Sequence, residues 1–165
     1  MPELNWNCRS ILRISHWSLV NASSGHQCSF GGHARPKPAE NVLHWLNQQN
    51  SGSLFISSIT IAEICYGLRV LPVGQRRRQL ETRFEAFVAQ GFSGRILDFD
   101  EAAARAYAEF MGICKEKGCP MSLPDGQIAA VAHVNRLALA TRNIRDFIMC
   151  GIELINPFEQ PAASP

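Results

Sequence analysis

The sequence has no long apolar run, no paired cysteine motif and no strong excess of charge of either sign. No apolar stretch approaches the ~18 residues that a membrane-spanning helix requires, so we expect no span. None of the six cysteines forms a Cys-x-x-Cys pair, and Cys65 lies inside an apolar helical pattern, which indicates reduced thiols in a cytoplasmic protein. Cys114, Cys119 and His133 offer ligand types that zinc binds, but their spacing is poor. The net charge of +2 permits a nucleic-acid partner without arguing for one.

The chain of 165 residues is long enough for one domain with a sizeable core, and its composition changes sharply near residue 35. Residues 1–34 show no sustained period of two or 3.6, and the segment around the Gly31-Gly32 pair is typical of a loop. From Arg35 onward every segment has a clear pattern. We therefore expect an aberrant, poorly ordered segment over 1–34, one folded domain over 35–158, and a disordered tail over 159–165.

Within the patterned part, helical periods alternate with short apolar runs. This alternation predicts an α/β fold with a mostly parallel central sheet and helices on both faces. In such sheets, ligands gather beyond the carboxyl ends of the strands. The predicted helices cover 37–49, 57–71, 75–89, 100–117, a helix opening at Asp125, and 144–147, and the predicted strands cover 54–56, 95–99, 137–140 and 151–155.

Four polar residues fall where this scheme places ligands. Asp125 stands between a proline and a glycine in the first turn of an Ala-rich helix, where the helix dipole favours a carboxylate, either as a cap or as a metal ligand. Glu63 lies one turn into the helix after the first visible strand, and Asn143 and Asp146 directly follow a later strand. Oxygen ligands of this kind suit Mg²⁺ or Mn²⁺, which bind through a few carboxylates and substrate phosphate.

Each of these residues also has a structural explanation. Thr60 to Glu63 fits a capping box, in which Glu63 would bond its own helix start. Asn143 fits an N-cap and Asp146 a solvated position in a short helix. Arg142 is either structural or a phosphate contact.

Two further charged features are best explained by structure. The Arg76-Arg77-Arg78 run opens a predicted helix and is interpreted as a solvated face, with a phosphate-backbone contact as the alternative. Asp98 and Asp100 form an Asp-x-Asp pair that lacks the nearby threonine of phosphotransferases, so Asp100 is interpreted as a helix cap.

Taken together, three segments occur in a specific order and spacing, and with them the chain resembles the PIN-domain family. The closer resemblance is to the VapC/FitB-like branch, the toxin ribonucleases of bacterial toxin–antitoxin pairs. It covers residues 35–158, and the start and end of this region are also similar to that branch. The matching segments are Ser57-x-x-Thr60-x-Ala62-Glu63, Asp125-Gly126-x-Ile128-Ala129-Ala130 and Ala140-Thr141-Arg142-Asn143-x-x-Asp146-Phe147, with Arg35-Pro36-Lys37-Pro38 and Ile155-Asn156-Pro157-Phe158 at the ends.

The resemblance implies a PIN-like α/β/α sandwich and a Mg²⁺-dependent (or Mn²⁺-dependent) endoribonuclease that acts on structured RNA. It also implies a homodimer and a small cognate antitoxin that blocks the site. Glu63 and Asp125 match family metal-site acids. Asn143 stands where many members carry aspartate, with Asp146 as a substitute ligand, so all four are candidate catalytic residues. Thr60 and Arg142 are candidate substrate-binding residues.

The start of the chain departs from the family, whose pattern begins with a strand carrying an Asp-Thr-Asn motif and the first metal acid. No such motif precedes Arg35, and the stretch from Ser24 to Ala34 stands in its place, so the first strand is expected to be missing or replaced. Synonymous codons for that stretch, read one base later, spell Leu-Asp-Thr-Asn-Val-Leu-Ser-Glu-Ala-Met. We hypothesise that residues 1–34 are read out of frame, through a sequencing error, a pseudogene lesion or a wrong start. Codons that do not spell the motif in the shifted frame would rule this out.

Because the first metal acid is missing, we consider three hypotheses for the function of the chain. The leading one is a toxin ribonuclease. The second is a catalytically impaired PIN-like protein that acts only as a dimerisation or antitoxin-binding module. The third, an unrelated α/β domain whose acids are only caps, is disfavoured by the three ordered motifs.

Overall fold

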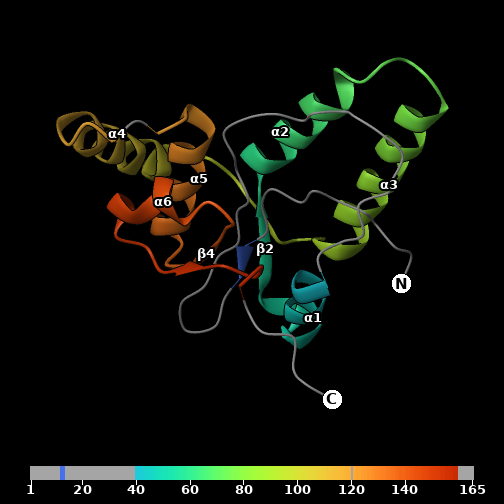
Figure 1. Cartoon of the computed structure of the whole chain (residues 1–165), viewed down its shortest axis with the longest axis horizontal. Coiled ribbons are helices and arrows are strands. Elements are labelled where there is room, and N and C mark those ends of the chain that lie inside the picture. Colours follow the sequence, from blue (N-terminus) through green and yellow to red (C-terminus); the bar gives the residue numbers. More distant parts are fainter. Residues whose placement is uncertain (1–11, 14–39, 120, 160–165) are drawn as a thin grey trace.

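The computed structural model describes residues 12–13, 40–119 and 121–159, which contain helices alternating with short strands (Figure 1). Our predictions for residues 1–34, other than Leu12 and Arg13, and for the tail beyond residue 159 lie outside this range. The elements are β1 (Leu12–Arg13), α1 (Glu40–Gln48), the 3₁₀ turn η1 (Ser51–Ser53), β2 (Leu54–Ser57), α2 (Ser58–Arg69), α3 (Gln75–Gly91), β3 (Ile96–Leu97), α4 (Glu101–Glu116), α5 (Leu123–Val134), β4 (Leu139–Ala140), α6 (Ile144–Phe147), the 3₁₀ turn η2 (Ile148–Cys150) and β5 (Leu154–Ile155).

The strands form the predicted mostly parallel arrangement. β2 pairs with β3 in parallel, and β4 pairs with β5 in parallel. β1 pairs antiparallel with β2 on its other side and also contacts β4, so it lies between the two pairs. The described residues of β1 thus form an antiparallel strand beside β2.

Helices cover both faces of the sheet. Neighbouring residues of a strand point to opposite faces, so they pack against different helices. Leu139 belongs to a core cluster with α4, α5 and η2, whereas the next residue, Ala140, belongs to a second cluster with Trp45 of α1 and Ile56 of β2. Figure 1 shows α4, α5 and α6 on one side of β2 and β4, with α2 and α3 on the other. The α/β layered architecture predicted from the sequence is therefore confirmed.

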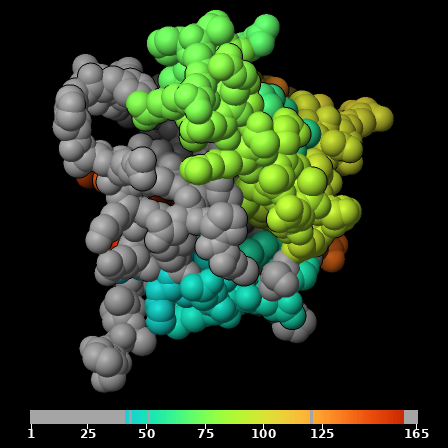
Figure 2. Space-filling model, turned by 90° about the vertical axis from the view of Figure 1, so that its right-hand side faces the viewer, coloured from blue at the N-terminus to red at the C-terminus, as the bar shows by residue number. Residues whose placement is uncertain are grey.

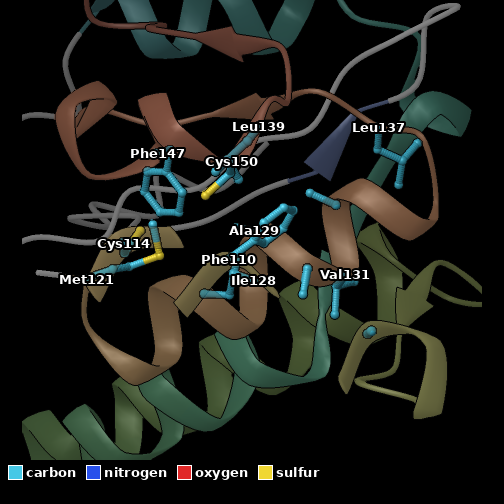
Figure 3. Packing of buried hydrophobic residues seen from close by; sticks show 13 residues of the cluster. Phe110, Cys114, Met121, Ile128, Ala129, Val131, Leu137, Leu139, Phe147 and Cys150 are labelled. Atoms are coloured by element: carbon cyan, nitrogen blue, oxygen red, sulfur yellow. The ribbon is translucent and has the colours of Figure 1, made fainter. Parts of the chain in front are cut away.

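Helix α5 is the most buried helix of the larger cluster. Residues 128–132 of α5 are all completely buried, and Phe110 of α4 and Phe147 of α6 pack around them (Figure 3). At Gly126, an added Cβ would lie 2.9 Å from both Met111 Sδ and Tyr107 Cε2. Glycine therefore lets α4 approach α5 at the turn that carries Asp125.

The predicted helix boundaries follow local signals, whereas three of the four predicted strands are shorter in the structure and only β2 extends further, to Ser57. Asp100 caps α4 by accepting a hydrogen bond from the Ala103 amide at 2.8 Å, and Gly118 ends that helix at φ +64°, both as expected. The predicted strand at 137–140 is reduced to two residues because Arg136 takes a positive φ of 52° and the Leu137 amide bonds the Ala132 carbonyl. Leu137 therefore completes the end of α5, and Ala138 takes a β-bridge position directly before β4.

The prediction that Arg76, Arg77 and Arg78 form a solvated face is wrong for Arg77. Its side chain is nearly buried, with Nε donating to Glu81 at 2.8 Å and an Nη donating to the Arg69 carbonyl at 3.0 Å. Arg77 thus ties α3 to the last turn of α2, while its two neighbours are exposed. Figure 2 shows the face of the molecule on which α3 lies.

Within the described residues, no helix is both long and apolar enough to cross a membrane. The four cysteines in this range are free thiols, with Cys114 and Cys150 buried and Cys65 and Cys119 exposed.

Candidate functional site

Most of the buried polar side chains lie at the ends of β2 and β4 and in the first turns of α2 and α5. Among the described residues, the buried polar or charged side chains are Ser57, Thr60, Arg77, Asp125 and Thr141. Ser57 ends β2, Thr141 follows β4, and Asp125 stands in the first turn of α5, which contacts both α2 and α6. Because burying a polar group is costly, this concentration indicates either a support for the chain or a site.

Asp125 is held by the residue that caps its helix. The Ser122 Oγ accepts a hydrogen bond from the Asp125 amide at 3.2 Å, and the Ser122 hydroxyl donates to Asp125 Oδ2 at 2.6 Å. The explanation of Asp125 as the cap is therefore wrong, because Ser122 is the N-cap. The Asp125 side chain is almost fully buried, and its Oδ1 atom is inaccessible to solvent.

Glu63 lies in the second turn of α2 and is not part of a capping box with Thr60. Ser57 caps this helix, accepting from the Thr60 amide at 3.0 Å, so Thr60 lies inside the helix. The Thr60 side chain is fully buried, and its Oγ1 lies 2.9 Å from Ser57 Oγ. Thr60 thus supports the start of α2, and its contact with a substrate stays a prediction. The Oε2 atom of Glu63 is buried.

Asn143 and Asp146 form a hydrogen-bonded pair after β4. The Asn143 backbone N–H donates to Thr141 Oγ1 at 2.9 Å, and the Asn143 side chain donates from Nδ2 to Asp146 Oδ2. Asn143 is the N-cap residue of α6, as one explanation predicted, but its side chain makes no capping bond and donates to Asp146 instead. Asp146 is half-buried and accepts from Asn143, so it is not simply solvated.

Arg142 is exposed and packs on the segment after β5. Its guanidinium carbon lies 5.4 Å from the centroid of the Phe158 ring, a cation–π distance. The Phe158 carbonyl accepts a hydrogen bond from the Asn41 side chain at 3.0 Å, which anchors this segment to α1. The charge of Arg142 is thereby held at the surface beside the Asn143–Asp146 pair.

Glu63 and Asp125 fit a hard divalent cation by donor type, because both supply buried carboxylate oxygens. A complete set of acids is not assembled, since the described part of the chain contains no group of three or more His, Cys, Asp or Glu side chains that could hold a metal. This also applies to the alternative zinc set, in which the His133 ring packs edge-on against Phe110. The first aspartate of the sequence is Asp98, so no aspartate in the first 97 residues supplies the missing acid.

Two residues near Asp125 were not singled out as site residues from the sequence. Ser122 carries a recognisable signal, because a serine three residues before an acid at a helix start is typical of reciprocal capping. Cys150 carries none, because η2 meets α5 only in the fold (Figure 3). Burial, followed by the proximity of Cys114 and Asp125, raises the pKa of the Cys150 thiol to about 12. Cys150 is therefore a neutral neighbour of the site.

Comparison with known proteins gives a consistent family match. The PIN domain family model matches residues 32–148. The VapC ribonuclease Y4jK of Sinorhizobium fredii is 38% identical over 125 residues, which are 76% of this chain and 89% of that protein. The toxin FitB of Neisseria gonorrhoeae is 36% identical over 75% of this chain and 89% of its own length.

Solved structures agree with the sequence relatives. The crystal structure of FitAcB from Neisseria gonorrhoeae superposes with a TM-score of 0.71 at 34% identity, over 76% of this chain and 90% of that one. The DNA-bound VapBC of Salmonella typhimurium gives a TM-score of 0.64 at 27% identity, over 74% and 88% of the two chains.

Proposed function

Since the chain belongs to the PIN-domain family, whose related proteins include toxin ribonucleases, we propose that it is a Mg²⁺-dependent endoribonuclease and the toxin of a toxin–antitoxin pair. The observation that supports the metal dependence is that two contacting helices each carry a carboxylate with a buried oxygen, Glu63 on α2 and Asp125 on α5. Mn²⁺ is the alternative ion, because it accepts the same oxygen ligands.

Glu63 and Asp125 would hold the ion through their carboxylate oxygens, and Asn143 would add a neutral amide oxygen. Asp146 accepts a hydrogen bond from the side-chain Nδ2 of Asn143, so Oδ1 of Asn143 is the atom that would serve as the ligand. When bound, the ion supplies Lewis-acid stabilisation of the charge that develops as water attacks a phosphodiester. Arg142 adds a guanidinium at the surface that can pair with an RNA phosphate.

The proposed partners follow from the names of the related complexes. FitAcB, FitAB and VapBC are solved as assemblies of two proteins, in two cases bound to DNA. We therefore propose a small cognate antitoxin that binds this chain and blocks the site, and a homodimer of the chain itself.

A catalytically impaired, partner-binding protein is the second candidate. Two observations favour it: no three-acid group occurs among the described residues, and the sequence contains no aspartate before Asp98. Such a protein would still dimerise or bind the antitoxin without cleaving RNA.

Cleavage of RNA by the purified full chain separates the two candidates. The ribonuclease proposal expects cleavage that requires Mg²⁺, stops with EDTA and falls at least about 100-fold in Asp125→Asn, since a metal ligand is removed. Glu153→Gln is the matched control, because Glu153 is exposed at the start of β5. A folded chain that binds the short protein encoded just upstream but never cleaves RNA would overturn the proposal in favour of the second candidate.

A further inference from the structure

Ser122 makes two different hydrogen bonds to the same residue. Its Oγ lone pair accepts the Asp125 amide at 3.2 Å, and its single hydroxyl proton is directed at Asp125 Oδ2, 2.6 Å away. An O–H donor bonded to a carboxylate at this distance is a strong, charge-assisted contact. One carboxylate oxygen of Asp125 is therefore fixed relative to the backbone of its own helix.

The other capped helices show that capping alone does not require this second bond. Asp100 caps α4 through the Ala103 amide, where the side chain offers nothing to bond. Ser57 caps α2 through the Thr60 amide, and its hydroxyl lies beside another hydroxyl. Only in α5, among the capped helices that the structure describes, does the capping side chain bond a carboxylate.

We propose that Ser122 is a positioning residue, which holds the Asp125 carboxylate in one rotamer and so preorganises it for a divalent cation. This inference rests on the proposed metal site. The Ser122 hydroxyl donates to Asp125 Oδ2, and the Ser122 Oγ accepts from the Asp125 backbone amide. Rotation of the Asp125 carboxylate would therefore break its contact with the hydroxyl. A ligand whose orientation is fixed before the metal arrives binds the metal more tightly, and removal of such outer partners typically weakens metal binding by about 10–100-fold.

The test must separate positioning from capping. Ser122→Gly removes the hydroxyl but keeps a residue that is tolerated at the N-cap, whereas Ser122→Thr keeps the hydroxyl. Asp100→Ala removes a cap from α4 and leaves Asp125 and its partner untouched. Mn²⁺ dissociation constants are measured by calorimetry on the full chain, together with the melting temperature of each variant.

Positioning by Ser122 predicts that Ser122→Gly weakens Mn²⁺ binding by about 10–100-fold and that Ser122→Thr restores it to within about threefold. Asp100→Ala should lower the melting temperature without changing Mn²⁺ affinity. If Ser122→Gly binds Mn²⁺ with wild-type affinity and Asp125→Asn abolishes binding, the positioning role of Ser122 is overturned and the metal site is not. Unchanged binding in Asp125→Asn, or no binding to the wild-type chain, overturns the metal site and this inference with it.

Discussion

The side-chain amide of Asn143 donates a hydrogen bond to Oδ2 of Asp146, one helical turn further along the chain. Replacing Asn143 with aspartate converts this bond into a repulsive pair of carboxylates and adds an anionic oxygen to the proposed site. We expect Asn143→Asp to lower the metal-free stability by about 1 kcal/mol and to raise Mn²⁺ affinity by roughly tenfold, measured by thermal melting and calorimetry.

Asn50→Asp is the control for this added charge. Asn50 is exposed, and its Oδ1 accepts the Gly52 amide at 2.9 Å, a bond that aspartate keeps. Unchanged or weaker Mn²⁺ binding in Asn143→Asp would show that this position does not face the metal.

Replacing a glycine of α4 and a glycine of α5 with alanine should change the free energy of unfolding in opposite directions. Gly112→Ala adds a Cβ to open space within α4, so it should stabilise the fold by about 0.5–1 kcal/mol through helix propensity. Gly126→Ala would force the Met111 and Tyr107 side chains aside, at a net cost of about 1–2 kcal/mol. Urea unfolding measures both, and equal effects would contradict the close approach of α4 and α5.

Arg77 should matter far more to stability than its neighbour in the same arginine run. Arg77→Met removes the bond to the Arg69 carbonyl and the pairing with Glu81, so it should cost about 1–2 kcal/mol in urea unfolding. Arg78→Met changes an exposed side chain and should stay within about 0.5 kcal/mol. A comparable loss in the two variants would mean that Arg77 does not tie α3 to α2.

Cys150 should be much less reactive than Cys119. Burial raises the pKa of the Cys150 thiol from 9.0 to about 12, whereas Cys119 is exposed. At pH 8 the thiolate fraction of Cys150 is then about a thousandfold below that of an ordinary thiol, so iodoacetamide should modify Cys119 first, as read by peptide mass spectrometry. Equal labelling rates in the native chain would contradict the burial of Cys150.

The same pKa shift sets the sign of a stability change at high pH. Below about pH 9 the Cys150 thiol is protonated in the folded and unfolded states alike. Between about pH 9 and 12 only the unfolded chain loses the proton, so the free energy of unfolding should fall as the pH rises through this window. In Cys150→Ala this part of the pH dependence should disappear.

Local sequence signals predicted most elements, because caps and breakers act over a few residues. Asp100 and Gly118 mark helix ends that the structure reproduces, whereas α5 begins at Leu123, two residues before the predicted start at Asp125. The burial of Arg77 could not be predicted, because its acceptor is the Arg69 carbonyl on another helix. Likewise, the sequence showed that Asp125 lies at a helix start but not that α2 and α6 contact that helix.

The sequence predicts the individual residues of the candidate site. Whether the set of metal ligands is complete depends on the start of the chain. Glu63, Asp125 and Asn143 were identified by motif and spacing, and their assignment as ligands stays a prediction. The aspartate that the family pattern places before Arg35 has no counterpart in this sequence, and the described residues of β1 are Leu12 and Arg13. No local pattern shows whether two carboxylates and an amide suffice to hold the ion.

The position of a bound Mn²⁺ ion tests the central claim most directly. Crystals of the full chain soaked in Mn²⁺ would locate the ion by its anomalous scattering. The proposed site predicts one peak at coordination distance, about 2.1 Å, from a carboxylate oxygen of both Glu63 and Asp125. A peak that touches neither carboxylate, or no peak in soaked crystals of the intact chain, would contradict the assignment of these residues as the metal centre.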